Sequence, residues 1–359
     1  MKKSGEHMLT GKRVLVTGGT GSLGKVLVRR LLSGELGVPK QITVFSRDEA
    51  KQHSMRLAFE RLRIATDEVI YHNFERMLQF RIGDVRDPHS VTTALTDADI
   101  VFNAAALKQV PSCEYFPYEA VQTNITGAEN IIRAIRESRI AVETVVGVST
   151  DKACKPVNVM GMTKAIQERL FVRANLDAEQ TRFIGVRYGN VLASRGSVIP
   201  LFHEQIRNGR PITITTADMT RFLLSLEQAV DTIFAALREA GRGEIYIPRV
   251  PSAKVTDVAA ALIGDRKIET VITGIRPGEK IHEILVSEEE AHRTVERGDY
   301  YVVQPMLPEL LPAEKIDNPI GHEYSSADNV MTRAEVTELL QRHKLMVGDR
   351  FVYEEDLLA

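Results

Sequence analysis

Short apolar runs alternate with amphipathic stretches through the first half of this chain. The runs are Arg13–Val16, Ile42–Phe45, Phe80–Ile82, Ile100–Phe102 and Val145–Val148, and a further strand is expected at Phe183–Val186. Helices are expected over 117–138, where apolar residues recur at helical spacing, and over about 158–174. Strands that alternate with helices predict a parallel, doubly wound sheet of the α/β class.

A glycine-rich segment, Thr17–Gly24, lies directly between the first run and the helical stretch that follows it. Glycines at this point let the backbone turn tightly and approach a pyrophosphate, whose charge then meets the helix N-terminus. The strand-turn-helix context favours dinucleotide binding over a plain tight turn. The predicted cofactor contacts here are Gly18, Thr20, Gly21, Ser22, Leu23 and Gly24.

The ends of the next strands predict the rest of the cofactor site. Ser46, Arg47 and Lys51 suit a 2'-phosphate and hence NADP, although Asp48 could serve the ribose hydroxyls of NAD and a solvated helix start would use the same residues. Asp84 and Val85 are expected at the adenine. The small residues Ala104, Ala105 and Ala106 are expected beside the cofactor.

The second half of the chain is less regular, because Pro200, Pro211, Pro248, Pro251 and Pro277 interrupt its short elements. We therefore expect a dinucleotide-binding domain over about 1–193 and mainly a smaller substrate-binding lobe with a C-terminal tail over 194–359. A short helix is expected at Arg333–Leu340.

The fifth predicted strand ends in charged residues that point to chemistry. Asp151 and Lys152 follow it, and Lys164 lies in the next helix. Ordinary short-chain dehydrogenases have a tyrosine four residues before this lysine, where Met160 cannot exchange a proton. Two interpretations compete: a protein that only binds or senses NADP, or an enzyme whose acid-base groups have moved. Charges at the carboxyl end of a central strand favour the enzyme over a merely solvated pair.

Composition excludes several classes of partner. Lys+Arg number 46 against Asp+Glu 48, a net charge of -2, so no basic excess predicts binding to nucleic acid or an anionic membrane. Met1–Thr10 is charged, and no apolar run of about 18 residues predicts a membrane span, which favours the cytoplasm. Cys113 and Cys154 lack metal-ligand spacing, so reduced thiols and no metal site are expected.

Several longer segments carry a resemblance to a known family. They are Phe45–Glu49, Ala105–Glu114, Ser149–Lys152, Arg187–Pro200, Met219–Phe222 and Arg276–Lys280. They resemble the bacterial UDP-N-acetylglucosamine 4,6-dehydratases of the extended short-chain dehydrogenase class, in particular the soluble dehydratase/5-epimerases of capsule and O-antigen synthesis that begin the UDP-N-acetyl-L-fucosamine pathway. The likeness covers most of the chain, and Met160 occurs in that subgroup.

The resemblance implies a Rossmann fold, NADP and a lyase reaction on UDP-N-acetylglucosamine. Oxidation at carbon 4 acidifies the hydrogen on carbon 5, water leaves across carbons 5 and 6, and a proton returns to carbon 5. Lys152 is the expected base, with a pKa lowered by burial and by Lys164. Asp151 is expected to protonate the departing hydroxyl and is also the candidate to take the O4 proton first. Lys164 is expected to hydrogen-bond the nicotinamide ribose.

The same family motifs indicate a nucleotide-sugar site. Arg221 and Arg276 are forked donors suited to a diphosphate, and Glu279 would accept from ribose hydroxyls. Asn190 and Lys108 are expected near the pyrophosphate or hexose. By resemblance alone, Val198, Pro200 and Thr213 are expected at the uracil.

Other functions stay open at this point. A carbon 5-retaining dehydratase shares the Asp-Lys-Met arrangement, and a UDP-sugar 4-epimerase shares the fold but normally uses the tyrosine that Met160 replaces. An NADP-binding sensor would have no need of Arg221 and Arg276. Family members form homo-oligomers, so a hexamer or a smaller even-numbered assembly is expected.

Overall fold

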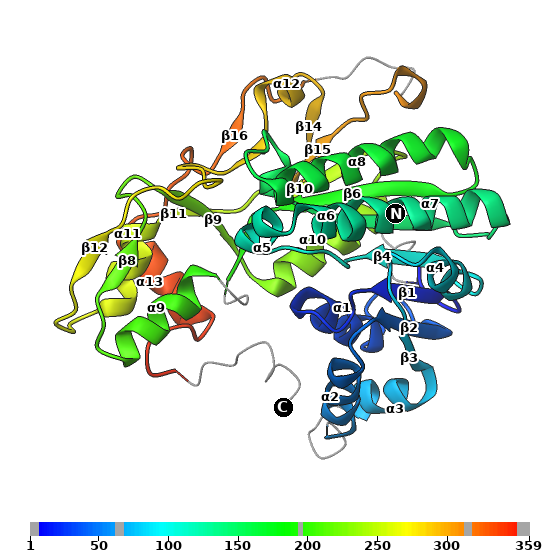
Figure 1. Cartoon of the computed structure of the whole chain (residues 1–359), viewed down its shortest axis with the longest axis horizontal. Helices are drawn as coiled ribbons and strands as arrows, with labels where there is room; N and C mark the ends of the chain where they lie inside the picture. The colour runs from blue at the N-terminus through cyan, green and yellow to red at the C-terminus, as the bar shows by residue number, and fades with distance from the viewer. Residues whose placement is uncertain (1–6, 62–67, 193–196, 312–317, 350–359) are drawn as a thin grey trace.

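A nine-stranded sheet runs through the computed structural model, which describes residues 7–61, 68–192, 197–311 and 318–349 (Figure 1). Its order is β14-β15-β10-β6-β5-β4-β1-β2-β3, with β1 to β6 and β10 parallel, and β15 antiparallel to both of its neighbours, β10 and β14. The strands are β1 (Arg13–Thr17), β2 (Gln41–Ser46), β3 (Leu78–Ile82), β4 (Ile100–Asn103), β5 (Thr144–Thr150), β6 (Arg182–Tyr188), β10 (Ile245–Pro248), β14 (Thr294–Arg297) and β15 (Tyr300–Val303).

The six strands predicted from the sequence are all confirmed, and β1 to β6 form the doubly wound arrangement that was expected. All six are longer than the predicted runs; β5 continues to Thr150 and β6 continues to Tyr188. This extension brings the functional residues after β5 to the carboxyl edge of the sheet, where open parallel sheets bind ligands.

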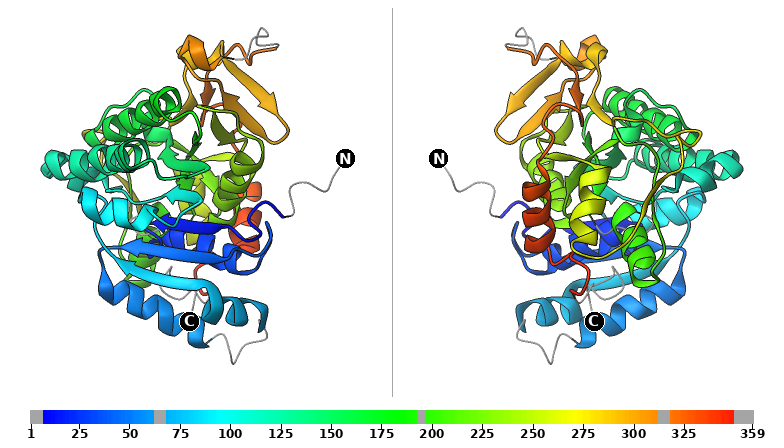
Figure 2. Two further views of the ribbon diagram at one scale, coloured as in Figure 1. Left: turned by 90° about the vertical axis from the view of Figure 1, so that its right-hand side faces the viewer. Right: turned by 90° about the vertical axis from the view of Figure 1, so that its left-hand side faces the viewer.

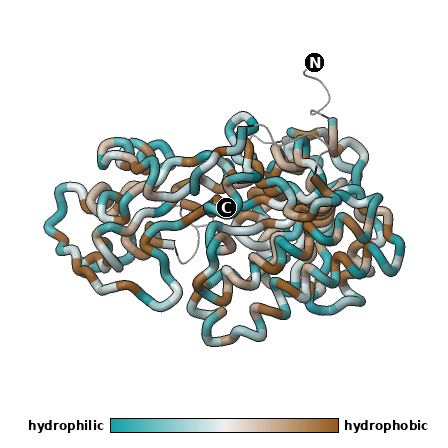
Figure 3. Tube along the Cα trace, turned by 90° about the horizontal axis from the view of Figure 1, so that it is seen from above, coloured by the Kyte–Doolittle hydropathy of each residue, from teal (hydrophilic) through white to brown (hydrophobic). Residues whose placement is uncertain are grey.

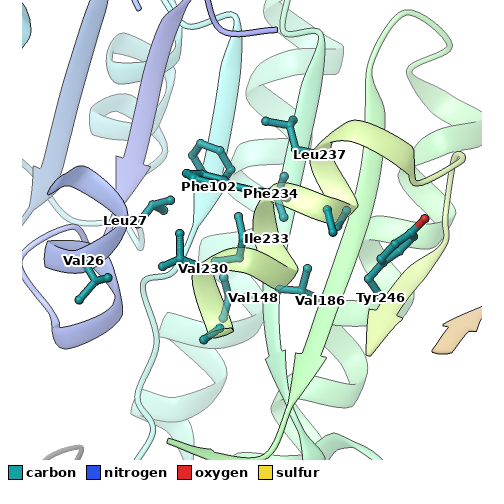
Figure 4. Close-up of a cluster of buried hydrophobic side chains, with 14 of the residues drawn as sticks. Val26, Leu27, Phe102, Val148, Val186, Val230, Ile233, Phe234, Leu237 and Tyr246 are labelled. Carbon is teal, nitrogen blue, oxygen red and sulfur yellow. The ribbon is translucent and has the colours of Figure 1, made fainter. Parts of the chain in front are cut away.

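Helices cover both faces of the sheet, as the two views of Figure 2 show. On one face, α4 (Pro88–Leu95) and α7 (Gly127–Ser138) pack on side chains such as Val101 and Val145. On the other, α1 (Ser22–Leu32) and α10 (Leu226–Glu239) share a buried apolar cluster (Figure 4). That cluster includes Val26, Leu27, Phe102, Val148, Val186, Val230, Ile233, Phe234, Leu237 and Tyr246.

The helix predicted over 117–138 is interrupted. It consists of α6 (Pro117–Ala120), a π-helical segment η2 (Val121–Thr126) and α7. Asn124 in η2 is buried, accepts from the Leu107 backbone N–H (2.8 Å) and donates to Thr163 Oγ1 (2.9 Å). Because π-helical turns re-aim side chains, this one joins the loop after β4 to α8 (Val159–Asp177), the helix predicted over 158–174.

A second lobe has its own apolar core, which includes Phe202, Ile212, Leu262 and Leu340. The elements after β6 that lie outside the large sheet and α10 are β7 (Asn190–Val191), α9 (Val198–Arg207), β8 (Ile212–Ile214), β9 (Thr220–Leu224), β11 (Ser252–Lys254), α11 (Val255–Ile263), β12 (Thr270–Ile272), β13 (Ile284–Val286), α12 (Glu288–Ala291), a 3-10 turn η4 (Pro308–Leu310), β16 (Tyr324–Ser325) and α13 (Arg333–Arg342). The last confirms the predicted C-terminal helix.

The chain does not divide cleanly between sheet and lobe. The predicted boundary at 193 and 194 lies outside the described residues, so the domain division stays a prediction. Three strands of the large sheet, β10, β14 and β15, come from the second half of the chain, as does α10. The second half therefore completes the large sheet as well as building the lobe.

Polar and apolar residues alternate over short distances along the chain (Figure 3). Among the residues that the structure describes, none of the helices combines the length and the apolar character needed to span a membrane.

Candidate active site

A cleft of about 1420 Å³ lies across the carboxyl ends of the parallel strands. Its wall includes Gly18 after β1, Ser46 at the end of β2, and Thr150 at the end of β5. The segment Arg276–Glu279 of the second half of the chain forms another part of the wall. The cleft is therefore shared between the sheet and the segment that leads into β13.

The glycine-rich loop fits a dinucleotide because it leaves no room for side chains. Gly18 has φ +67°, and a Cβ there would lie 2.8 Å from the backbone N of Ala105. A Cβ on Gly24 would lie 2.5 Å from Cα of Gly19. Gly21 is the N-cap of α1, so the N–H groups at the start of the helix are available to a pyrophosphate. The predicted contacts Thr20, Ser22 and Leu23 also line the cleft.

Hydrogen bonds hold the ends of β1 and β4 together beneath this loop. Thr17 Oγ1 donates to Asn103 Oδ1 (2.8 Å) and accepts from the backbone N–H of Ala105 (3.2 Å). The predicted small residues Ala104, Ala105 and Ala106 consequently lie in the cleft wall beside the glycine loop.

The end of β2 presents basic side chains to the cleft. Ser46 Oγ lies 3.0 Å from Thr20 Oγ1, and Arg47 is 59% exposed. Asp48 accepts from the backbone N–H of Lys51 (3.0 Å) and pairs with its Nζ (3.1 Å) at the start of α2 (Glu49–Arg61). The hydrogen bond from the Lys51 backbone is the main reason that the pKa of Asp48 is lowered. Arg47 and Lys51 both line the cleft.

Asp84 and Val85 lie in the cleft wall as predicted, but the Asp84 carboxylate already has cationic partners. Arg86 binds it through Nε (2.9 Å) and Nη2 (2.7 Å), and Arg47 Nη1 is 3.8 Å away. Burial raises the pKa of Asp84, and the hydrogen bonds from Arg86 more than offset this, so the pKa falls below its usual value. Asp84 therefore stays charged and fixes Arg86 beside this end of the cleft.

Asp151 and Lys152 form a short 3-10 turn, η3 (Asp151–Ala153), directly after β5. Thr150 Oγ1 donates to Asp151 Oδ1 (2.8 Å), and Lys152 Nζ donates to the same oxygen (2.9 Å). Lys152 Nζ also lies 3.4 Å from Glu283 Oε1. Thr150, Lys152 and Glu283 line the cleft, whereas Asp151 is fully buried and is not part of its wall.

The two lysines of the site, half-buried Lys152 and buried Lys164, have pKa values that move in opposite directions. Burial lowers the pKa of Lys152, but the charges of Asp151 and Glu283 more than compensate, so its pKa lies above the usual value. The expectation of a lowered pKa at Lys152 was wrong. Lys164 donates to Val148 O (2.8 Å) and to the amide oxygen Oε1 of Gln167 (2.9 Å). Burial lowers the pKa of Lys164 to about 8.

Met160 lies one turn before Lys164 on α8, as the sequence predicts, and both residues line the cleft. It is buried and packs with Cys113 and Ala120. Its thioether carries no exchangeable proton, so proton transfer here needs other groups.

Arg221 is held in the cleft wall by the segment before β13. Its guanidinium donates to the backbone oxygens of Thr220 (2.7 Å), Lys280 (3.0 Å) and Ile281 (3.0 Å). Its Nε lies 3.8 Å from Glu283 Oε1. The guanidinium charge is thereby fixed at one place in the cleft.

Four other predicted substrate residues also line the cleft. Arg276 is 61% exposed, and its Nη1 lies 4.0 Å from Glu279 Oε1. Asn190 Oδ1 is buried and makes no hydrogen bond with the described part of the chain. Lys108 lies on the loop after β4. With Arg221, these groups form what we call the polar half of the cleft.

Three predicted residues do not reach the cleft wall within the described part of the chain. Val198 and Pro200 belong to α9, and Thr213 on β8 accepts from Gln205 Nε2 (2.8 Å). The adjoining residues 193–196 of the predicted motif lie outside the described residues. A uracil pocket at these positions therefore stays a prediction.

Comparison with known proteins places the chain in a family. A family described as polysaccharide biosynthesis protein matches residues 14–305. The chain belongs to this family. This polysaccharide biosynthesis protein is 43% identical to a UDP-N-acetylglucosamine 4,6-dehydratase (inverting) from Campylobacter jejuni subsp. jejuni serotype O:23/36, over 84% of the chain and 85% of that protein. It is also 43% identical to a UDP-glucose 4-epimerase from Rickettsia bellii, over 82% and 83% of the two chains.

Solved structures share its fold. Pen from Bacillus thuringiensis has a TM-score of 0.82 and 34% identity, covering 94% of this polysaccharide biosynthesis protein and 99% of that chain. A dTDP-glucose 4,6-dehydratase from Streptomyces venezuelae, with NAD bound, has a TM-score of 0.63 and 21% identity over 75% and 86% of the two chains. The fold is the extended short-chain dehydrogenase fold.

The cleft of this polysaccharide biosynthesis protein also contains polar residues that sequence reasoning missed. Thr150 and Ser149 belong to a motif that was recognised, yet their hydroxyls received no role. Glu283 follows the Arg276–Lys280 motif, and nothing in the local sequence distinguishes it from the many surface glutamates. Its place in the cleft wall and its contacts with Lys152 and Arg221 mark it as part of the site.

Proposed function

We propose that this protein is a UDP-N-acetylglucosamine 4,6-dehydratase that also inverts carbon 5. The product is UDP-2-acetamido-2,6-dideoxy-β-L-arabino-hexos-4-ulose, used for a surface polysaccharide such as capsule or O-antigen. The observation that carries the proposal is a charged Lys152 in the wall of a dinucleotide cleft, with Met160 in the position of the usual tyrosine. The name of the Campylobacter jejuni relative supports the same assignment.

The cofactor that we propose is NADP rather than NAD. Ser46 stands at the end of β2, and Arg47 and Lys51 offer cationic groups that suit a 2'-phosphate. Asp48, which an NAD site could use, is paired with Lys51. When bound, NADP+ supplies the hydride acceptor for carbon 4 and the hydride donor for carbon 6.

Lys152 is the proposed base at carbon 5. The neutral fraction of this amine, which grows as the pH rises toward its raised pKa, takes the carbon 5 proton, which the carbon 4 ketone makes acidic, and the resulting ammonium gives that proton to the hydroxyl that leaves carbon 6 as water. The proton count of Lys152 is thus restored. The second step was expected of Asp151, but Asp151 is buried behind the cleft wall, and Lys152 is the group that lies in the wall.

Asp151 reaches the cleft through Thr150. The Thr150 hydroxyl lies in the wall and donates to Asp151 Oδ1 (2.8 Å). During oxidation the proton of the carbon 4 hydroxyl passes to Thr150 while the Thr150 proton passes to Asp151. Asp151 later releases this proton to solvent, and a solvent proton is added to carbon 5 on the opposite face, so the protons balance over the whole reaction. This relay supplies the proton acceptor that Met160 cannot provide.

The polar half of the cleft is the proposed nucleotide-sugar site. Arg221 and Arg276 bind the diphosphate, because guanidinium groups form paired hydrogen bonds with phosphate oxygens. Glu279 accepts from ribose hydroxyls, and Lys108 and Asn190 contact the hexose or the pyrophosphate.

Proton NMR of the purified protein with UDP-N-acetylglucosamine in deuterated water tests the reaction. We expect a carbon 6 methyl signal, a 4-keto sugar of L-configuration and deuterium at carbon 5. NADPH should not accumulate, because the hydride returns to the same sugar.

Other outcomes of this measurement identify the alternatives. A 4-keto product of D-configuration indicates a retaining dehydratase. Conversion to a carbon 4 epimer without a methyl signal indicates a UDP-sugar 4-epimerase, the activity in the name of the Rickettsia bellii relative. An unchanged sugar with NADP bound to the protein favours a sensor.

We also propose a cytoplasmic homo-oligomer, up to a hexamer. Tyr115, Phe116 and Tyr118 are exposed around α5 (Val110–Tyr115) and α6. Exposed aromatic side chains that gather on one surface are typical of protein interfaces, which supports self-association.

A further inference from the structure

Glu283 is a buried carboxylate beside Lys152. Its side chain is 3% exposed, and its Oε1 lies 3.4 Å from Lys152 Nζ and 3.8 Å from Arg221 Nε. Its Oε2 is buried and has no hydrogen-bond partner among the described residues. A buried carboxylate is stable only with compensating charge, so Lys152 and Arg221 account for its presence, and the site depends on it in return.

The backbone of Glu283 is fixed independently of Lys152. Its N–H donates to Ser326 Oγ (2.9 Å), and the Ser326 N–H donates to the Glu283 carbonyl (2.8 Å). These bonds join the start of β13 to β16, which pair in an antiparallel ribbon. The carboxylate is therefore presented to the cleft from a rigid position.

The position of the Lys152 amine depends on the groups that bind its nitrogen. Its ammonium sits on a flexible four-carbon stem, which samples many positions unless its nitrogen is bound. Asp151, one contact of that nitrogen, lies next to Lys152 in the same turn. Glu283 holds the nitrogen from the opposite segment, so the amine is fixed between η3 and the start of β13.

We infer that Glu283 is a positioning residue of the reaction, which holds the Lys152 amine at the cleft wall and sets the pH at which that amine becomes a base. The inference rests on the proposed function, because that function gives Lys152 its role at carbon 5. It adds a residue that no sequence motif indicated.

The charges around Lys152 give the direction of the effect. Burial and the cations Arg221 and Lys280 favour the neutral amine, whereas Asp151 and Glu283 favour the ammonium. Without the Glu283 charge, only the Asp151 carboxylate is left to oppose the charges of Arg221 and Lys280 at the Lys152 amine. The pKa of Lys152 then falls, and the neutral amine forms at lower pH.

Glu283→Gln and Glu283→Asp test the inference, with Glu288→Gln, an exposed glutamate of α12, as the matched control. In Glu283→Gln we expect kcat to fall by about 100-fold, the scale typical of a misplaced catalytic group, with little change in KM. The rising limb of the kcat–pH profile should move to lower pH by about 1 unit or more.

Glu283→Asp keeps the negative charge, so the rising limb of its kcat–pH profile should stay near that of the wild type. Its kcat should still fall, because the shorter side chain withdraws the carboxylate by one methylene. Glu288→Gln should behave as wild type.

A second measurement needs no turnover. The pH dependence of Lys152 acetylation, followed by peptide mass spectrometry, reports the ionisation of this amine directly. Its midpoint should be lower in Glu283→Gln than in the wild type and unchanged in Glu288→Gln. If Glu283→Gln does not fold, Glu283→Asp with reduced kcat and an unmoved limb supports the inference.

The two proposals fail in different ways. A wild type without activity on UDP-N-acetylglucosamine contradicts the proposed function. An active wild type whose Glu283 variants keep its kcat, or an unmoved acetylation midpoint in Glu283→Gln, overturns the role of Glu283.

Discussion

Arg47 is one of the residues that we propose to contact the 2'-phosphate of NADP. It lies at the end of β2 in the cleft wall, is 59% exposed, and pairs only distantly with Asp84 (3.8 Å). A bond from a guanidinium to phosphate is charge-assisted, so Arg47→Ala should weaken NADP binding by about tenfold or more. NAD lacks that phosphate and should bind as before. Isothermal titration calorimetry with each nucleotide measures both dissociation constants.

Arg133→Ala is the matched control, because Arg133 is a similarly exposed arginine on α7 and lies outside the cleft wall. It should leave both dissociation constants unchanged. Equal losses for NADP and NAD in Arg47→Ala would show that Arg47 does not recognise the 2'-phosphate.

The start of α8 is bonded to the segment Arg276–Glu279, which we propose to bind the nucleotide sugar. Asn158 caps this helix by accepting from the Gly161 N–H (2.8 Å), and its Nδ2 donates to Gly278 O (2.8 Å), between Arg276 and Glu279. Asn158→Ala should cost about 1 kcal/mol of unfolding free energy through the lost cap. It should also raise KM for the nucleotide sugar several-fold, because the loop loses its anchor. Urea unfolding and steady-state kinetics measure the two effects.

Thr332→Ala removes a comparable cap from α13, where the Thr332 hydroxyl accepts from the Glu335 N–H (3.4 Å). It should lower stability by a similar amount without changing KM. If the two variants change KM equally, the loss follows from lower stability and not from the loop.

A buried network of ion pairs around Arg187 on β6 links the large sheet to elements from the second half of the chain. Its guanidinium binds Glu168 of α8 (Nη2 to Oε2, 2.7 Å), Glu290 of α12 (Nη1 to Oε2, 2.7 Å) and the Leu285 carbonyl of β13 (2.8 Å). Burial raises the pKa of Glu290, but Arg187 outweighs this and lowers it to about 2. The network therefore fixes β13, and with it Glu283, against the large sheet.

This network makes stability sensitive to acid in a defined window. Because the folded pKa of Glu290 is lower than its unfolded value of 4.5, its contribution is complete above that value and is lost as the pH falls toward 2. Glu290→Gln should cost about 3–5 kcal/mol at pH 7, since it leaves Arg187 with a weaker partner. Urea unfolding of both proteins at several pH values should show this difference shrink in acid. A difference that stays constant with pH would contradict the assignment.

The sequence by itself determined the parts that depend on local pattern. Apolar runs and helical spacing were enough for β1 to β6 and α7, because these periodicities reflect which face of an element is buried. The glycine loop after β1 was also predicted from a local motif. In the structure, a Cβ on Gly18 would clash with the backbone of Ala105, so a glycine is needed there. Most predicted cofactor and substrate residues lie in one cleft, since the carboxyl ends of parallel strands share an edge.

Only the tertiary structure decided which charges meet. It buried Asp151 behind the wall, raised the pKa of Lys152 where a lowered value was expected, and brought Glu283 to Lys152 from the start of β13. It also added β10, β14 and β15 to the large sheet. The physical reason is the same in each case: a pKa, a buried ion pair or a strand neighbour depends on groups far apart in the chain, and local periodicity carries no information about them.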